Sequence, residues 1–265
     1  MRTIHWLMAA MFALMVTGCV GVQSGPTPDE RNALAPTGKL RVAFIIAPTH
    51  ATKDAASGEF KGVAVDLGNE LARRLGVPFE PVPYTSFPAL FTDAQSGRWD
   101  VATMGISAER AQTVDFSAPY MEVEFTYLVP KGSAISALTE VDRPGVRIAV
   151  LQKSSPDAYL SGAVRQATII RVPTIAGMLE SLQTGKADVL YGTKAGLLTQ
   201  AEKLSGSRVL DGRFGGEETG MAVPKGRALS AAYVRGFVES AKSEGVVKAA
   251  IERAGLRGVV VAPLK

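Results

Sequence analysis

The chain has 265 residues, of which 46% are hydrophobic and 20% charged, and its formal net charge is +4. These values exclude an intrinsically disordered chain, a coiled coil and a collagen-like repeat. The single cysteine rules out an intramolecular disulfide and any multi-cysteine zinc or iron–sulfur centre. A mild positive charge without dense lysine or arginine runs argues against nucleic-acid binding. The length predicts one large domain or two modest ones.

The first segment has the pattern of a secretory signal. Arg2 precedes an apolar run over residues 6–16, which is too short to span a bilayer. We therefore predict a signal peptide over residues 1–18 and a location in the periplasm or at the cell surface. The end of this segment, Val16-Thr17-Gly18-Cys19, resembles the lipobox of bacterial lipoproteins. That resemblance implies acylation of Cys19 and a lipid anchor in a membrane; the alternative is a free cysteine after a plain signal peptide.

Residues 19–37 are rich in glycine, serine and proline and contain few large apolar residues. That composition is typical of a flexible linker. We expect this segment to be a tether between the lipid anchor and the folded body.

The remaining sequence alternates short apolar runs with helix-period stretches. The helix predicted over residues 63–75 repeats Leu67, Leu71 and Leu75 at a spacing of four, and Gly76 can end it. The other predicted elements are strands over residues 40–46, 101–106 and 146–151 and a helix over residues 229–241. Strands that alternate with helices indicate an α/β fold with parallel-rich sheets.

One short segment recurs. Residues 95–101 (QSGRWDV) resemble residues 183–189 (QTGKADV), and each copy follows a helical stretch and leads into an apolar strand. The repeat favours two lobes of related architecture, which agrees with the length. The alternative is chance recurrence of a common helix–glycine–strand unit.

No pattern of catalytic or cofactor-binding residues is present. The chain has two histidines; His5 lies in the predicted signal, and His50 lies in a loop where we expect it to be solvated. Adjacent acids such as Glu217 and Glu218, or Glu122 and Glu124, are typical of solvated faces. A Gly-x-Ser-x-Gly elbow, a phosphate-binding loop and metal-ligand spacing are all missing. The sequence therefore predicts no catalytic residue, no cofactor and no metal.

A candidate anion site follows the strand predicted over residues 101–106. Ligands in open α/β sheets bind beyond the carboxyl ends of strands, and Gly105 and Ser107 lie at this end. We expect a helix to begin at Ser107, so that its backbone N–H groups and Arg110 can bind a carboxylate. The alternative is an ordinary surface arginine.

A second helix start follows the strand predicted over residues 146–151. We expect Ser155 to be the N-cap, Pro156 the first helical residue and Asp157 an acid in the first turn. If the two helix starts face one cleft, they can hold a small anion between the lobes. The alternative is an ordinary serine cap.

These residues belong to a longer series of motifs. The series resembles the family 3 extracellular solute-binding proteins, the polar amino-acid receptors of ABC importers, and the resemblance extends from about residue 38 to about residue 255. Its motifs occur in the family's order: GKLRV at 38–42, GVAVDL at 62–67 with ELA at 70–72, GRWDV at 97–101, GISAER at 105–110, VDFSAPY at 114–120, GVRIAV at 145–150, GKAD at 185–188 and GMAVPKG at 220–226.

The resemblance implies a two-lobed fold of the periplasmic-binding-protein type II class, in which two crossing strands form the hinge. Lobe 1 would comprise residues 38–124 and 224–265, and lobe 2 residues 125–223. The crossings would lie near residues 123–129 and 220–223. A ligand would bind in the cleft between the lobes.

The resemblance also implies which residues bind the ligand. Arg110 corresponds to the arginine that binds the ligand's α-carboxylate. Gly105 and Ser107 would assist it from the same lobe, and Ser154 and Ser155 would donate to the same carboxylate from the other lobe.

Three positions depart from the amino-acid-binding pattern. Pro48 replaces the aromatic residue that stacks on the ligand, Thr193 replaces the aspartate that binds its ammonium, and Lys153 replaces a glycine. A neutral threonine cannot compensate a buried ammonium. The ligand is therefore either a carboxylate without an α-amino group or an amino acid whose ammonium meets another acid, Glu217 or Glu218.

The function that this resemblance implies is that of a monomeric, membrane-anchored receptor. It would capture a small carboxylate, an amino acid or a related organic acid, and deliver it to ABC permease subunits. One alternative is an enzyme similar to the cyclohexadienyl dehydratases, which eliminate water and carbon dioxide from prephenate or arogenate, with Glu217, Glu218 or Glu122 as the acid. Another is a ligand-sensing adaptor. Prephenate turnover identifies the enzyme, and neighbouring permease and ATPase genes favour transport.

Overall fold

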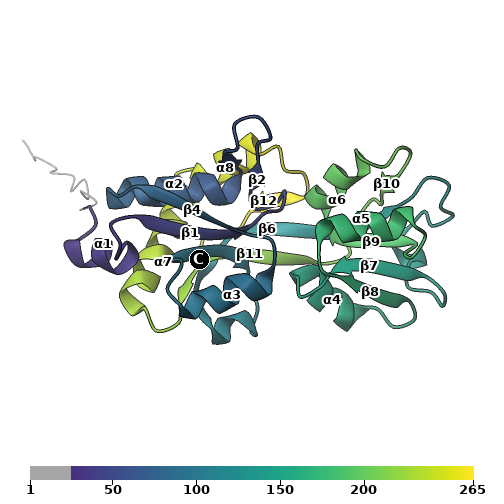
Figure 1. Ribbon diagram of the computed structural model, residues 1–265, viewed down its shortest axis with the longest axis horizontal. Coiled ribbons are helices and arrows are strands. Elements are labelled where there is room, and N and C mark those ends of the chain that lie inside the picture. The colour runs from purple at the N-terminus through teal and green to yellow at the C-terminus, as the bar shows by residue number, and fades with distance from the viewer. Residues whose placement is uncertain (1–24) are drawn as a thin grey trace, which may run out of the picture.

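The described residues are 25–265 of a computed structural model, so the predicted signal peptide and Cys19 lie outside them. Strands and helices alternate along the chain (Figure 1). The helices are α1 (Pro28–Leu34), α2 (Val63–Leu75), α3 (Phe87–Gln95), α4 (Ser155–Ala163), α5 (Ile175–Gln183), α6 (Lys194–Ala201), α7 (Ala228–Ser243) and α8 (Val246–Arg253), with 3₁₀ turns η1 (Arg110–Gln112) and η2 (Leu138–Glu140). The strands are β1 (Leu40–Ile45), β2 (Thr52–Lys53), β3 (Phe60–Lys61), β4 (Phe79–Tyr84), β5 (Val101–Gly105), β6 (Val114–Val129), β7 (Arg147–Leu151), β8 (Thr168–Val172), β9 (Val189–Thr193), β10 (Arg208–Val209), β11 (Gly216–Pro224) and β12 (Val259–Val261).

The first lobe is a layer of sheet between helices. Its strands lie in the order β4-β1-β5-β11-β6, with β4, β1 and β5 parallel. Val42 packs in one hydrophobic cluster with α2, α7 and α8, whereas Ala43 packs in another with α3. Successive residues of β1 thus bury opposite faces, and α2 and α3 cover opposite sides of the sheet (Figure 1). Helix α2 has the predicted bounds and ends at Gly76, whose φ of 68° is left-handed.

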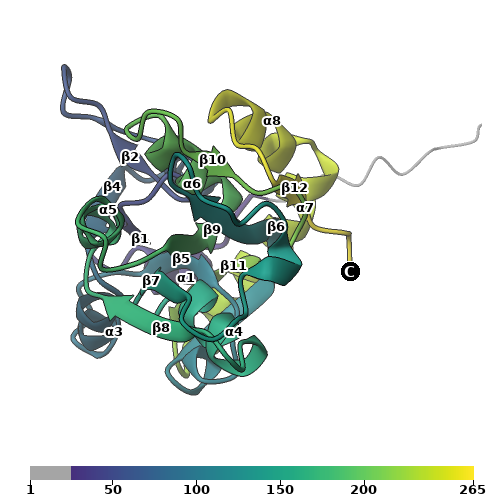
Figure 2. The ribbon, with the colours of Figure 1, turned by 90° about the vertical axis from the view of Figure 1, so that its right-hand side faces the viewer.

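The second lobe repeats this plan (Figure 2). Strands β9, β7 and β8 are parallel, and the far half of β6 pairs antiparallel with β9. Ala149 of β7 packs with α5 and α6, whereas its neighbours Ile148 and Val150 pack in the cluster that includes Leu160 of α4. The two-lobed α/β fold expected from the sequence is confirmed.

Two strands join the lobes. β6 runs through both, and β11 returns beside it. The return crossing differs from the expected residues 220–223, because residues 219–222 pair with β5 in the first lobe. The chain instead changes lobe around Gly215, whose carbonyl accepts from the backbone N–H of Phe125 at 3.0 Å. Met221 and Val223 are fully buried, so burial of these apolar side chains holds this part of β11 in the first lobe. The exact division into lobes stays a prediction.

The segment expected to be a tether is partly folded. Residues 28–34 form α1, which Thr27 and Glu30 start with a reciprocal capping box. Leu34 is fully buried, and Arg31 Nε donates to the carbonyl of Leu75 at 2.8 Å. The capping box stabilises the start of α1, and the burial of Leu34 and the bond from Arg31 to Leu75 hold the helix against the first lobe. Within residues 25–265, none of the helices has the length and hydropathy required to cross a membrane.

Candidate functional site

Two cavities lie between the lobes and share a wall. We name the larger one, of about 770 Å³, the Arg110 chamber, because Arg110, Ser107 and Lys153 line it. The smaller one, of about 280 Å³, is the Thr193 chamber, since Thr193 and Pro48 line it. The side chains common to both chambers are Phe87, Ser154, Ser155 and Glu217. A ligand held at this wall contacts both lobes.

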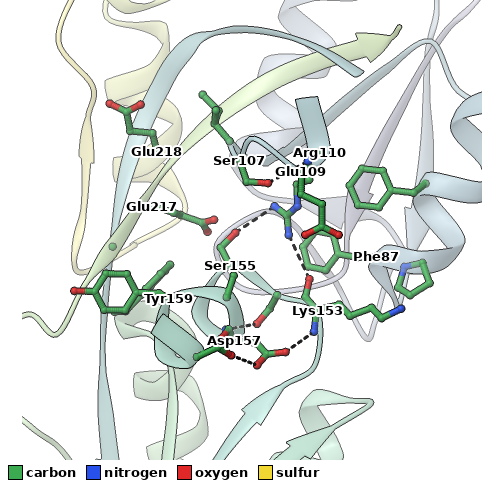
Figure 3. Close-up of a pocket in the computed structure, with 18 of the residues that line it drawn as sticks. Phe87, Ser107, Glu109, Arg110, Lys153, Ser155, Asp157, Tyr159, Glu217 and Glu218 are labelled. Carbon is green, nitrogen blue, oxygen red and sulfur yellow. Dashed lines mark hydrogen bonds between the residues drawn. The ribbon is translucent and has the colours of Figure 1, made fainter. Parts of the chain in front are cut away.

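Arg110 crosses the gap between the lobes. Arg110 is only 8% exposed. Its Nη1 donates to the carbonyl of Gly105 at 2.8 Å and to Ser155 Oγ at 3.2 Å (Figure 3). Its Nη2 lies 3.4 Å from the carbonyl of Lys153. The guanidinium lies 4.3 Å from the centre of the Phe87 ring, in cation–π geometry. Burial lowers the pKa of Arg110, yet an arginine keeps its charge at neutral pH.

The helix expected at Ser107 is not present. Arg110 instead begins the 3₁₀ turn η1, and Ser107 Oγ accepts the Arg110 backbone N–H at 3.2 Å. Three residues of 3₁₀ helix give little dipole, so the first lobe contributes mainly the guanidinium charge. The expectation of two facing α-helix starts was wrong in this respect.

The helix start of the second lobe is present, one residue earlier than expected. Ser154, not Ser155, is the N-cap, and its Oγ accepts from the Asp157 backbone N–H at 3.2 Å. The shift frees the Ser155 side chain from capping, so Ser155 Oγ faces Arg110. Asp157 accepts from the Lys153 backbone N–H at 2.9 Å and from Arg171 Nε at 2.8 Å, which fixes the turn before α4.

Pro48 and Thr193 both line the smaller chamber, and their contact with a ligand stays a prediction. Thr193 is the N-cap of α6, and its Oγ1 accepts from the Gly196 backbone N–H at 3.2 Å. The Thr193 hydroxyl is therefore already engaged in capping α6. Apolar side chains supply much of the wall: Ile45, Leu151, Ile175, Met178 and Leu197.

Glu217 is not on a solvated face. Its carboxylate reaches into the cleft, where Oε2 is shielded from solvent and has no hydrogen-bond partner among residues 25–265. Glu218, the next residue of β11, points away from it (Figure 3). Burial raises the pKa of Glu217, while the nearby Ser155 hydroxyl and the positive charge of Arg110 lower it, although the Ser155–Glu217 contact lacks the geometry of a hydrogen bond. Adjacent residues of a strand face opposite sides, so both acids line the Arg110 chamber but Glu217 alone also reaches the Thr193 chamber.

His50 and Gln200 were missed as site residues. His50 was expected in solvent, but it is only 5% exposed, and burial with a contribution from Arg110 lowers its pKa to about 4. The imidazole is therefore neutral at pH 7. Gln200 is 7% exposed and lines the Thr193 chamber with it. A signal for Gln200 existed, because it follows the buried Leu197 by three residues on the same face of α6.

The arrangement suits a small carboxylate. A buried arginine beside a serine hydroxyl and a capped helix start can bind an anion through charge-assisted hydrogen bonds. Gly105, Ser107, Ser154 and Ser155 all lie around Arg110, but their ligand contacts stay predictions. In the described part of the chain, no cluster of three His, Cys, Asp or Glu side chains has the arrangement of a metal site.

Comparison with known proteins points to one group. A family model described as bacterial extracellular solute-binding proteins, family 3, matches residues 40–254. The ABC transporter glutamine-binding protein GlnH of Bacillus subtilis is 28% identical over 201 residues, which cover 73% of this chain and 72% of that protein. Cyclohexadienyl dehydratase of Pseudomonas aeruginosa is 27% identical over 193 residues, which cover 71% of each protein.

A solved structure of an amino acid-binding protein is also similar to this chain. The crystal structure of AncCDT-1, an ancestral amino acid-binding protein and precursor of cyclohexadienyl dehydratase, matches with a TM-score of 0.73 and 27% identity. The match covers 84% of this chain and 98% of that one. The relatives therefore include both receptors and an enzyme, so the residues of the cleft have to distinguish the two functions.

Proposed function

Because the chain belongs to the bacterial extracellular solute-binding proteins of family 3, we propose that it is the receptor of an ABC importer for an amino acid or a related small carboxylate. The relative GlnH is a glutamine-binding protein of such a transporter, which supports this assignment. Family membership makes the chain a solute-binding protein that acts outside the cytoplasm.

One observation carries the proposal: the contact between Arg110 and Ser155. Arg110 comes from the first lobe and Ser155 from the second, and both line the Arg110 chamber. A carboxylate bound between them contacts both lobes at once. The ligand therefore has a higher affinity for the closed form than for an open one, and that difference is what drives closure. The closed surface is then available for the permease subunits to recognise.

A ligand screen tests the receptor function. Residues 20–265, which include all described residues, are tested for thermal stabilisation by amino acids, keto acids, dicarboxylates and aromatic acids. A ligand at 100 times its Kd adds about 2.7 kcal/mol to the free energy of unfolding. The expected result is a rise of several degrees in Tm with at least one carboxylate. Absence of any shift across the panel contradicts the proposed function.

We also propose that Cys19 carries a lipid anchor and that residues 1–18 are removed as a signal peptide. The support is the Val16-Thr17-Gly18-Cys19 sequence alone, which lies outside the described residues. Buried acyl chains contribute about 0.8 kcal/mol per methylene to membrane binding. The full chain should therefore sediment with membranes, and Cys19→Ala should release it to the soluble fraction. Membrane association that survives this substitution refutes the anchor.

Both halves of the site come from one chain, so a single copy is sufficient for binding, and we propose a monomer. Light scattering of the purified protein should give one chain's mass with and without ligand. A dimer that dissociates or forms with ligand would contradict this.

A second function is favoured by one observation. Burial raises the pKa of Glu217, and a buried carboxyl group beside a carboxylate site can act as a general acid, as elimination chemistry of the dehydratase type requires. Incubation with prephenate separates the two functions. A receptor leaves prephenate unchanged, whereas catalytic turnover that Glu217→Gln abolishes would identify an enzyme.

A further inference from the structure

Three buried polar atoms at the Thr193 chamber have no hydrogen-bond partner among residues 25–265. They are His50 Nδ1, Gln200 Oε1 and Glu217 Oε2, and all three side chains line this chamber. His50 follows β1 in the first lobe, Gln200 lies on α6 in the second, and Glu217 lies on β11 near the hinge. Buried polar groups normally have partners, so three of them around one cavity indicate a ligand that supplies the missing bonds.

The three atoms share a chemical character. A glutamine carbonyl oxygen and a carboxylate oxygen accept hydrogen bonds, whereas a neutral imidazole accepts at one ring nitrogen and donates at the other. The His50 pKa of about 4 keeps this ring neutral at physiological pH. The ligand that fits the chamber therefore carries hydrogen-bond donors for at least Gln200 Oε1 and Glu217 Oε2.

The charge balance of the chamber is also incomplete. Glu217 has no lysine or arginine nitrogen within 4.0 Å among the described ion pairs, and the lysine that lines the same chamber, Lys203, is exposed. Arg110 lowers the pKa of Glu217 from a distance, but its Nη1 donates to the Gly105 carbonyl and to Ser155 Oγ, so the carboxylate has no directly paired cation, which is unfavourable when it is buried. A ligand ammonium placed against Glu217 supplies the missing positive charge.

The position of Glu217 relative to the carboxylate site matches an α-amino acid. A Cβ atom added to Gly105 would overlap Glu217 Oε2 and lie 2.6 Å from Ser155 Oγ, so both oxygens converge above Gly105. Arg110 Nη1 in turn donates to this Ser155 hydroxyl. The anion site and the free carboxylate are thus adjacent. The carboxylate and ammonium of an α-amino acid are attached to one carbon atom, so they can occupy both positions together.

We infer that Glu217 takes the place of the missing acid at Thr193 and binds the α-ammonium group of the ligand. Gln200 then accepts a hydrogen bond from a donor on the ligand's side chain, and His50 Nδ1 forms a hydrogen bond with the same side chain. The substrate class is an α-amino acid whose side chain carries N–H groups. This inference rests on the proposed receptor function and deepens it.

Matched pairs of ligands test the role of Glu217. We would measure affinities by calorimetry for L-glutamine against glutaramic acid, which lacks only the α-amino group, and for L-arginine against 5-guanidinopentanoic acid. The wild-type chain should prefer the amino member of a pair by about 100-fold, equivalent to about 2.7 kcal/mol. In Glu217→Gln the preference should fall below about fivefold, through weaker binding of the amino member only.

Glu252→Gln is the control, because it removes the same charge from a side chain that is 66% exposed and lies outside both chambers. This variant should keep the wild-type preference. If Glu217→Gln does not fold, the wild-type preference still decides the ligand class.

The outcomes separate the inference from the function on which it rests. Binding of the deaminated members alone, or a preference that Glu217→Gln leaves intact, overturns the inference and retains a carboxylate receptor. An equal loss of affinity for both members of a pair in Glu217→Gln also overturns the inference, because Glu217 then supports the site without selecting the ammonium group. Absence of binding for all carboxylates overturns the proposed function itself.

Discussion

Arg110 Nη1 of the first lobe donates a hydrogen bond to Ser155 Oγ of the second lobe over 3.2 Å. The contact exists because Ser154 caps α4 and leaves Ser155 to face the cleft. The ring of Phe87 supports the guanidinium from one side, so the position of Arg110 is set by packing as well as by hydrogen bonds. Carboxylate binding and lobe closure are coupled through this pair.

Replacement of Arg110 tests the carboxylate site. Arg110→Ala should weaken binding of any carboxylate ligand at least about 100-fold, because charge-assisted bonds contribute about 1.5–3 kcal/mol each. Calorimetry with a ligand from the screen measures the loss. Arg98→Ala is the control, since Arg98 has a 72% exposed side chain and lies outside both chambers. Affinity that survives in Arg110→Ala would remove Arg110 from the site.

The two lobes contain the same ion pair in different surroundings. Arg41 binds Asp100, and Arg147 binds Asp188, each through Nη2 at 2.7 Å and with the arginine backbone N–H also donating to the aspartate. The Asp100 side chain is fully buried, whereas that of Asp188 is 36% exposed.

Loss of a partner from a buried ion pair costs about 3–5 kcal/mol, but an exposed pair contributes at most about 1 kcal/mol. Asp100→Ala should therefore lower the free energy of unfolding by about 3 kcal/mol, and Asp188→Ala by about 1 kcal/mol or less. Urea denaturation of the two variants measures the difference. Equal costs would show that burial does not separate these pairs.

Burial of His50 makes stability depend on pH. The pKa of His50 is about 4 in the folded chain and 6.5 in the unfolded chain, so the unfolded chain binds more protons between these two pH values. Stability is fully retained above pH 6.5 and is lost as the pH falls towards 4. Glu217 has a raised pKa and an opposite slope, so the comparison must cancel its effect.

The variant His50→Asn provides that comparison, because Glu217 is present in both chains. Between pH 7.5 and pH 5 the wild type should lose about 2 kcal/mol more unfolding free energy than His50→Asn. Denaturation curves at the two pH values measure this. Parallel losses in the two chains would place His50 in contact with solvent.

Lys153 carries a backbone strain that glycine can relieve. With a φ of 58°, Lys153 is the one non-glycine residue among residues 25–265 that has a positive φ. A left-handed conformation costs an L-residue about 1–2 kcal/mol, so Lys153→Gly should raise the free energy of unfolding by about 1 kcal/mol. Lys153→Ala keeps the strain and should leave stability near the wild-type value. A lower Tm for Lys153→Gly would show that the lysine side chain outweighs its backbone cost.

Thr193→Asp would restore the acid expected at this position. Aspartate is also a good N-cap, so α6 should keep its start. The affinity ratio of L-glutamine over glutaramic acid should rise in this variant, because the added charge lies on the wall of the Thr193 chamber. The ratio is measured by calorimetry. An unchanged ratio would mean that Thr193 does not face the ligand's amino group.

The sequence by itself determined many of the local elements, though not the turn at Ser107 or helix α1, and it indicated the doubling of the lobes. Helix α2 has its predicted bounds, because Leu67, Leu71 and Leu75 form one face and Gly76 ends it. The recurring segment around Asp100 and Asp188 reflects a repeated ion pair. These features follow from short-range spacing and chain direction, which one strand or helix carries in its own residues.

Only the tertiary structure decided which polar residues face the ligand. Glu217 and Glu218 are identical neighbours, and the pairing of β11 with β6 at the hinge determines that Glu217 is the one shared by both chambers. His50 and Gln200 are brought to the same chamber from different lobes. Burial depends on what the rest of the chain places around a side chain, so no local pattern in the sequence contains it.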